Sequence, residues 1–188
     1  LRVKRGDRVG ILVPQKPETA IAHIACWKMG AISVPLSTLF GPEAIQYRLN
    51  DCGAKVCIVD ASVLNTFRKV RDKLPNLKHT IVLGESDLAR DELNFWDTLS
   101  DAKSNTRMYK SEDPAVIIYA SGTTGDPKSV VHAHRVLLGH LPMFLTTWCN
   151  LEIHESDLAW TPSELAWIAS LFDVLFPSLF YGIPALAY

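Results

Sequence analysis

Short apolar runs alternate with segments of helical periodicity over the first 84 residues. The runs at 7–14, 31–35, 55–60 and 79–84 are rich in β-branched residues, which is typical of buried strands. The longer segments between them have the apolar spacing of amphipathic helices. This alternation predicts an α/β fold, a three-layer sandwich in which helices cover a mainly parallel sheet.

Start and stop signals bound the first predicted helix. Pro17 stands at its beginning and Gly30 directly after its end, which is the usual order of these two residues around a helix. Ala20, Ile24 and Trp27 recur at positions i, i+4 and i+7 and mark an apolar stripe along it. The next helical segment is bounded in the same way.

The pattern divides the chain into two α/β portions, residues 1–84 and 114–188. Residues 85–113 between them are mostly polar and charged, so we expect a surface connection between two subdomains. After it the pattern restarts with an apolar strand at 114–120, a glycine-rich loop and a helix from about 134 to 148.

The last 24 residues contain a single charged side chain and raise the question of a membrane span. About 20 apolar residues suffice to cross a bilayer. Asp173, Pro177, Gly182 and Pro184 argue against a span, because charge and helix-breaking residues interrupt the run. A buried helix, a turn and a short core strand explain the same letters, so we expect no transmembrane segment.

Composition and charge exclude several classes of partner. The 188 residues are 48% hydrophobic, and 19 basic residues balance 20 acidic ones, so no basic stripe for nucleic acid is present. The four cysteines show no framework or metal-binding spacing, and His132 and His134 have no ligand spaced beside them. The chain opens without a signal sequence. We therefore expect reduced thiols, no metal site and a cytoplasmic location.

The loop "YASGTTGDPKS" at 119–129 concentrates groups that can bind an anion. Glycines allow the backbone N–H groups to approach a ligand, hydroxyls add donors, and a lysine adds charge. The residues are Ser121, Gly122, Thr123, Thr124, Gly125 and Lys128. A strand, this loop and a following helix predict a phosphate-binding site, and the alternative is a polar surface turn with a chance lysine.

A P-loop of the NTPase type is the weaker hypothesis for this segment. The letters from Gly122 match G-x-x-x-x-G-K-[ST] except at Pro127, where the motif has its second glycine. Proline has no N–H group and a fixed φ, so it can neither donate to phosphate nor adopt the glycine conformation.

The stretch "YASGTTGDPKSV" resembles the phosphate-loop signature [YF]-[TA]-S-G-[TS]-T-G-x-P-K-G-V of the AMP-forming adenylate synthetases, which include acyl-CoA synthetases, luciferases and peptide-synthetase adenylation domains. Only Ser129 departs from it. The stretch "KRGDRVGILVPQKPETAIAHIACWKMGAISVPLS" resembles the family's first βαβ unit. The resemblance implies that both portions belong to one truncated AMP-binding domain, part of the large N-terminal domain of an adenylate-forming enzyme.

Within that superfamily the chain looks most like acetyl-CoA-synthetase-like and medium-chain acyl-CoA synthetases. Relatives use the segment that matches "AWIASL" for the acyl pocket, so the resemblance makes Trp167, Ile168 and Ala169 candidates to line it. The alternative is that all three are core residues of one buried helix.

The resemblance implies a two-step reaction with ATP, Mg²⁺ and CoA on a small carboxylic acid. A carboxylate attacks the α-phosphate of ATP, and the thiol of CoA then displaces AMP. A carboxylate is already a nucleophile, so catalysis would rest on positioning and on charge from Lys128, the loop donors and Mg²⁺. Lys128 is the expected catalytic residue.

The family's adenine and ribose motifs and its C-terminal catalytic lysine are not found in these residues. We therefore expect a fragment that is inactive by itself, from a protein that could form a homo-oligomer. A different hypothesis is a non-catalytic nucleotide-binding or scaffold protein that retains the fold, and Ser129 in place of the family glycine favours it.

Overall fold

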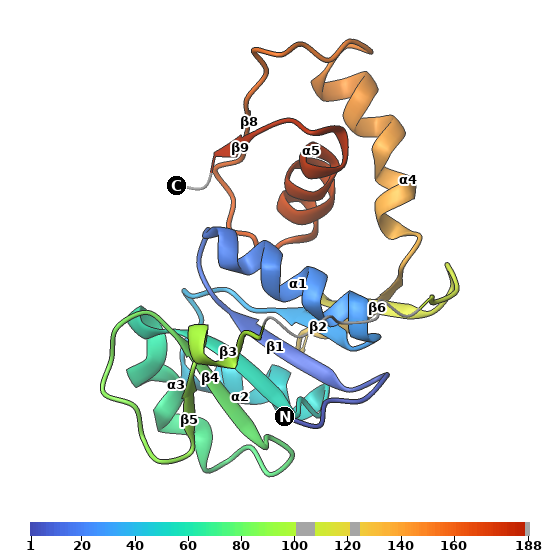
Figure 1. The fold of residues 1–188 in the computed structure, drawn as a ribbon. Coiled ribbons are helices and arrows are strands. Elements are labelled where there is room, and N and C mark those ends of the chain that lie inside the picture. Colours follow the sequence, from blue (N-terminus) through green and yellow to red (C-terminus); the bar gives the residue numbers. More distant parts are fainter. Residues whose placement is uncertain (101–107, 121–124, 187–188) are drawn as a thin grey trace.

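The computed structural model describes residues 1–100, 108–120 and 125–186. A seven-stranded sheet in the order β5-β4-β3-β1-β2-β6-β7 forms its centre (Figure 1). All neighbouring pairs are parallel except β6 and β7. The strands are β1 (Arg8–Leu12), β2 (Ile32–Pro35), β3 (Val56–Asp60), β4 (His79–Leu83), β5 (Glu92–Asn94), β6 (Pro114–Ala120) and β7 (Lys128–Ala133). The predicted α/β fold with a mainly parallel sheet is confirmed.

Helices cover the two faces of this sheet in separate layers. Helix α1 (Pro17–Met29) packs on one face, and α2 (Pro42–Asp51) and α3 (Leu64–Arg71) pack on the other. Successive strand residues point to opposite faces, so Ile11 joins the α1 layer whereas Leu12 joins the α2 and α3 layer. This arrangement explains why the strands read as continuous apolar runs.

Two apolar clusters lie between the sheet and its helix layers, and a third joins the C-terminal part to β6 and α1. The C-terminal part contains α4 (Val136–Met143), the π-helical segments η3 (Phe144–Trp148) and η4 (Ala169–Leu175), α5 (Phe176–Tyr181), and the short parallel strands β8 (Ala159–Trp160) and β9 (Ala185–Leu186). Phe172 and Phe176 contact Val116 and Ile118 of β6 in this cluster. In the part of the chain that the structure describes, no helix is long and apolar enough to cross a membrane. Asp173 pairs with His140 of α4.

Helix α1 buries a different face from the one its apolar stripe predicted. The residues that are buried are Thr19, Ala22, His23 and Cys26. Ile24 is 40% exposed, whereas Trp27 is partly buried between two clusters. Ala22 and Cys26 pack on the sheet, whereas Ala20 and Trp27 also pack against the C-terminal part, so the apolar residues of α1 are divided between two surfaces.

Two further expectations change with the structure. The segment after the glycine-rich loop is the antiparallel strand β7, so the predicted order of strand, loop and helix is wrong. The predicted C-terminal core strand exists as β9, but Leu186 in it is 49% exposed. The segment 85–113 contains β5, which pairs with β4, and the same sheet continues into β6. The division into subdomains at this segment stays a prediction.

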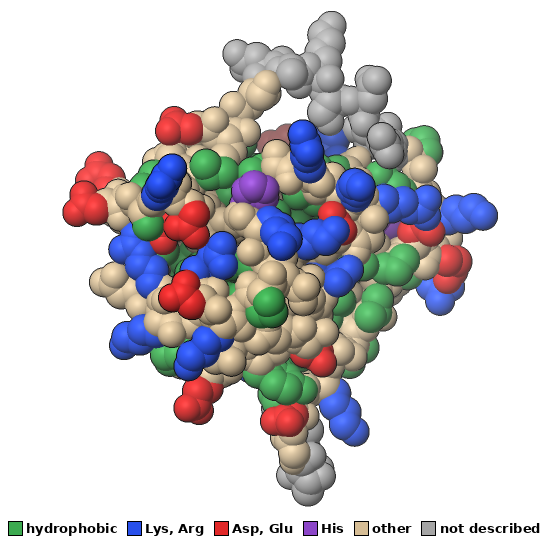
Figure 2. All heavy atoms as spheres, turned by 90° about the horizontal axis from the view of Figure 1, so that it is seen from below, with side chains coloured by type: hydrophobic (Ala, Val, Ile, Leu, Met, Phe, Trp, Pro, Cys, Tyr) green, Lys and Arg blue, Asp and Glu red, His purple; other side chains and the backbone are tan. Residues whose placement is uncertain are grey.

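Ion pairs join neighbouring elements at the outside of the sheet. Arg68 of α3 binds Glu92 of β5 at 2.6 Å. The Arg68 guanidinium holds the pKa of the Glu92 carboxyl below its ordinary value. Figure 2 shows Lys and Arg side chains interspersed with Asp and Glu over the face seen from below.

Candidate functional site

The predicted phosphate loop joins the two strands of the β6–β7 hairpin. Ser121, Gly122, Thr123 and Thr124 lie outside the described residues. Gly125 has a φ of 91°, in the left-handed region that favours glycine, and a Cβ built there would meet no atom within 4 Å. Backbone conformation, not crowding, is therefore what calls for glycine at this position.

Lys128 stands at the exit of the loop and begins β7. Its backbone pairs with Ala120, the last residue of β6. The side chain is exposed, and no ion pair to it is found among residues 1–100, 108–120 and 125–186. Since β6 runs parallel to the central strands, the hairpin presents this cation at their carboxyl edge, where open α/β sheets bind ligands.

Two tyrosines connect α2 to the loop end of the hairpin, Tyr47 on the helix and Tyr119 on β6. The Tyr119 hydroxyl of β6 donates a hydrogen bond to Asp51 at 2.6 Å. The Tyr47 hydroxyl donates to the carbonyl oxygen of Pro127 at 3.1 Å. The rings of Tyr47 and Tyr119 meet edge to face with 6.4 Å between their centroids. Burial, followed by the contact with Asp51, raises the pKa of Tyr119, so this phenol stays a neutral donor.

Arg48 lies beside these tyrosines and is nearly fully buried. Its guanidinium carbon is 4.0 Å from the centroid of the Phe40 ring and 5.5 Å from that of Tyr119. Its Nη1 donates to the carbonyl oxygen of Ala44, while Nε has no partner in the described structure. Burial lowers the pKa of Arg48. Cation–π contacts thus replace the carboxylate that a buried arginine usually pairs with.

The segment 161–169 is attached to the carboxyl end of β2 by one carboxylate. Glu164 accepts hydrogen bonds from the hydroxyl of Ser37, and from the hydroxyl and backbone N–H of Thr38 at 2.7 and 3.2 Å. Because β2 pairs with β6, this segment and the end of β6 that leads into the predicted loop lie at the carboxyl ends of neighbouring strands.

The candidate acyl-pocket residues follow this anchor. Trp167 is 42% exposed, Ala169 is exposed, and Ile168 is partly buried against the third cluster. The alternative that all three are core residues is therefore wrong. Their role in an acyl pocket stays a prediction.

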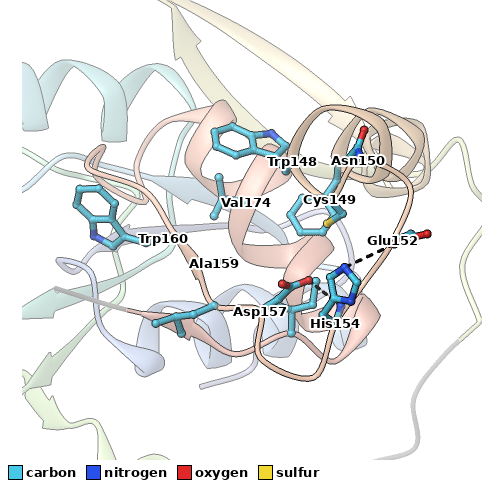
Figure 3. A pocket seen from close by; sticks show the side chains of 12 residues that line it. Trp148, Cys149, Asn150, Glu152, His154, Asp157, Ala159, Trp160 and Val174 are labelled. Carbon is cyan, nitrogen blue, oxygen red and sulfur yellow. Dashed lines mark hydrogen bonds and ion pairs between the residues drawn. The ribbon is translucent and has the colours of Figure 1, made fainter.

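A cavity of about 430 Å³ opens in the C-terminal part, away from the predicted site residues (Figure 3). His154 lies there between Glu152 and Asp157, and its Nε2 is 3.7 Å from Glu152 Oε2. Trp148 and Trp160 line other sides of the cavity. Among the described residues, no group of three or more His, Cys, Asp or Glu side chains could hold a metal ion.

Comparison with known proteins identifies the family. A family model described as "AMP-binding enzyme" matches residues 1–186. The chain belongs to the AMP-binding enzyme family. An acetyl-coenzyme A synthetase of Methanothrix thermoacetophila is 31% identical over 205 aligned positions, which cover 100% of this chain and 31% of that protein. One of Bacillus subtilis is 30% identical over 183 positions, covering 94% of this chain and 31% of that protein.

A solved structure of another protein shares the fold. The anthranilate CoA ligase AuaEII in complex with anthranoyl-AMP superposes with a TM-score of 0.81 at 30% sequence identity, covering 99% of this chain and 36% of that one. The chain thus spans about a third of the length of the relatives it matches.

Sequence reasoning missed the residues that support the loop and the candidate acyl segment. Tyr47 and Asp51 are one helical turn apart on α2, a spacing that places them on one face. That spacing was the available signal for a shared role. Glu164 is an acidic residue at the start of a largely apolar segment, which pointed to a specific partner.

Proposed function

We propose that the protein activates a short- or medium-chain carboxylic acid with ATP and transfers the acyl group to CoA. The observation that carries this proposal is the β6–β7 hairpin, which bears the signature 119–129 and exposes Lys128 at the carboxyl edge of the sheet. Membership of the AMP-binding family and the acetyl-coenzyme A synthetase relatives support it.

The first step forms a bond between a carboxylate oxygen and the α-phosphorus of ATP, and breaks the bond to the pyrophosphate oxygen. In the second step the thiol sulfur of CoA attacks the acyl carbon, AMP leaves with the bonding electron pair, and the thiol proton is lost. Lys128 contributes positive charge next to the departing pyrophosphate in the first step. Neither step requires a nucleophilic side chain of the protein.

In this proposal Mg²⁺ would enter the site bound to ATP. The described residues offer no group of acidic or histidine side chains that could hold it. We therefore assign it no ligand in this chain and derive no step from it.

The acyl group lies next to residues 167–169 in this proposal. The position of these residues supports this role, because Glu164 holds the segment at the end of β2, beside the strand that leads into the loop. Exposed Trp167 and Ala169 would face a substrate or further residues of the protein.

A cytoplasmic location also belongs to the proposal. Its support is that Cys26, Cys52 and Cys57 are buried free thiols and Cys149 is free as well, which fits a reducing compartment. The homo-oligomer stays a prediction, and light scattering on the complete protein would measure it.

The second candidate, a non-catalytic nucleotide-binding protein, is favoured by Ser129, which replaces the family glycine and pairs with Tyr119 in the hairpin. A pyrophosphate-release assay on the complete protein, with acids from acetate to decanoate, separates the two. The proposed function predicts acid-dependent release with at least one of these acids. Binding of ATP without release for any of them would favour the second candidate.

A further inference from the structure

One face of α2 contacts β6 and the residue that directly precedes β7 in the hairpin that carries Lys128. Asp51 accepts from Tyr119 near the end of β6, at 2.6 Å. Four residues earlier on the helix, Tyr47 donates to the carbonyl oxygen of Pro127, at 3.1 Å. Positions i and i+4 of a helix lie above one another, so the two contacts come from one rigid surface.

The contact from Tyr47 acts on the peptide bond that joins Pro127 to Lys128. The proline ring fixes φ at Pro127, and pairing with Ala120 fixes the backbone of Lys128 in β7. The hydrogen bond therefore orients the backbone immediately before the point where the lysine stem begins. An ammonium on a flexible stem of four carbons depends on such a fixed base to act at a defined place.

We propose that Tyr47 is a positioning residue for Lys128 during acyl-AMP formation, while Asp51 and Tyr119 hold the opposite strand. This inference rests on the proposed function of the hairpin. It gives α2 a role in the reaction besides covering the sheet.

Ring packing alone is the alternative explanation for Tyr47. Its ring lies edge to face against Tyr119, and a phenylalanine would keep that packing. Tyr47→Phe removes only the hydroxyl that reaches Pro127, so it separates the two explanations. Tyr181→Phe is the matched control, because its ring stacks on Phe144 and no hydrogen bond of its hydroxyl is found among the described residues.

Hydrogen–deuterium exchange and the two half-reactions, measured on the complete protein, test the proposal. Losing one hydrogen bond to a carbonyl oxygen should change a rate or an equilibrium constant by about threefold to tenfold. We expect Tyr47→Phe to speed exchange in peptides covering 125–133 and to slow acyl-AMP formation by about that factor. Thioester formation from preformed acyl-AMP and CoA should keep its rate, since pyrophosphate has left by then. Tyr181→Phe should change none of these.

A second test introduces Tyr47→Phe into protein that already carries Lys128→Ala. If Tyr47 acts through Lys128, Tyr47→Phe causes no further loss of acyl-AMP formation in Lys128→Ala protein. Unchanged exchange at 125–133, an equal loss in both half-reactions, or fully additive losses would each overturn the positioning role. A wild-type protein that releases no pyrophosphate with any acid would instead overturn the proposed function, and the exchange result would still show whether Tyr47 anchors the hairpin.

Discussion

Replacing His23 by asparagine should remove much of the protein's sensitivity to mild acid. His23 is fully buried on α1, with its Nδ1 2.8 Å from the hydroxyl oxygen of Ser33 and its ring beside Trp27 and Phe176. Burial lowers the pKa of His23 from 6.5 to about 3. No carboxylate among the described residues pairs with His23, so the imidazolium would lack a counter-charge there.

The sign of the effect follows from the two pKa values. Below pH 6.5 the unfolded chain binds a proton at His23 that the folded chain refuses until about pH 3. The free energy of unfolding therefore falls as the pH drops through this window. Each unit of pH below 6.5 lowers the free energy of unfolding by about 1.4 kcal/mol. The loss due to His23 should therefore be about 2 kcal/mol at about pH 5.

Urea unfolding between about pH 7.5 and 5 measures this slope. Asparagine can keep a hydrogen bond to Ser33 and cannot titrate, so His23→Asn should flatten the slope even if it lowers stability at every pH. Burial also lowers the pKa values of His132 and His134, so some slope remains. Equal slopes for wild type and His23→Asn would refute the argument.

Two other substitutions test how the elements are held. Gly30→Ala should lower the free energy of unfolding by at least about 1 kcal/mol in urea, because φ is 77° and the new Cβ would lie 2.5 Å from the Tyr109 ring. Gly41→Ala, at a φ of −70° with open space, is its control, and equal stability of the two variants would contradict the reasoning. Glu164→Ala should lower the free energy of unfolding by about 1–3 kcal/mol and speed hydrogen exchange at 161–169. Glu155→Ala, at an exposed position, is its control and should do neither. Unchanged exchange in Glu164→Ala would show that Glu164 does not hold this segment.

The order of elements could be predicted from the sequence because strands buried on both faces and bounded helices leave a strong pattern. Pro17 and Gly30 bound α1 as expected. Strand β7 could not be predicted in the same way, since most of its side chains are exposed and only its pairing with β6 defines it. The buried face of α1 was also hidden, because buried His23 looks polar in the sequence while Ile24 faces outward.

Only the candidate site residues that belong to a recognisable sequence motif could be predicted. The loop motif predicts Gly125 and Lys128 as site residues, and the hairpin brings both to the carboxyl edge of the sheet. Tyr47 lies about eighty positions earlier in the chain than Pro127. Contacts at that separation are created by the packing of α2 on the sheet, and no local pattern encodes them.

In the proposed function, Lys128 acts on the departing pyrophosphate. The most direct measurement compares the two half-reactions of the complete protein before and after Lys128→Ala. We expect a loss on the order of a hundredfold in acyl-AMP formation and an unchanged rate of CoA transfer from preformed acyl-AMP. An equal loss in both half-reactions, or no loss in either, would contradict it.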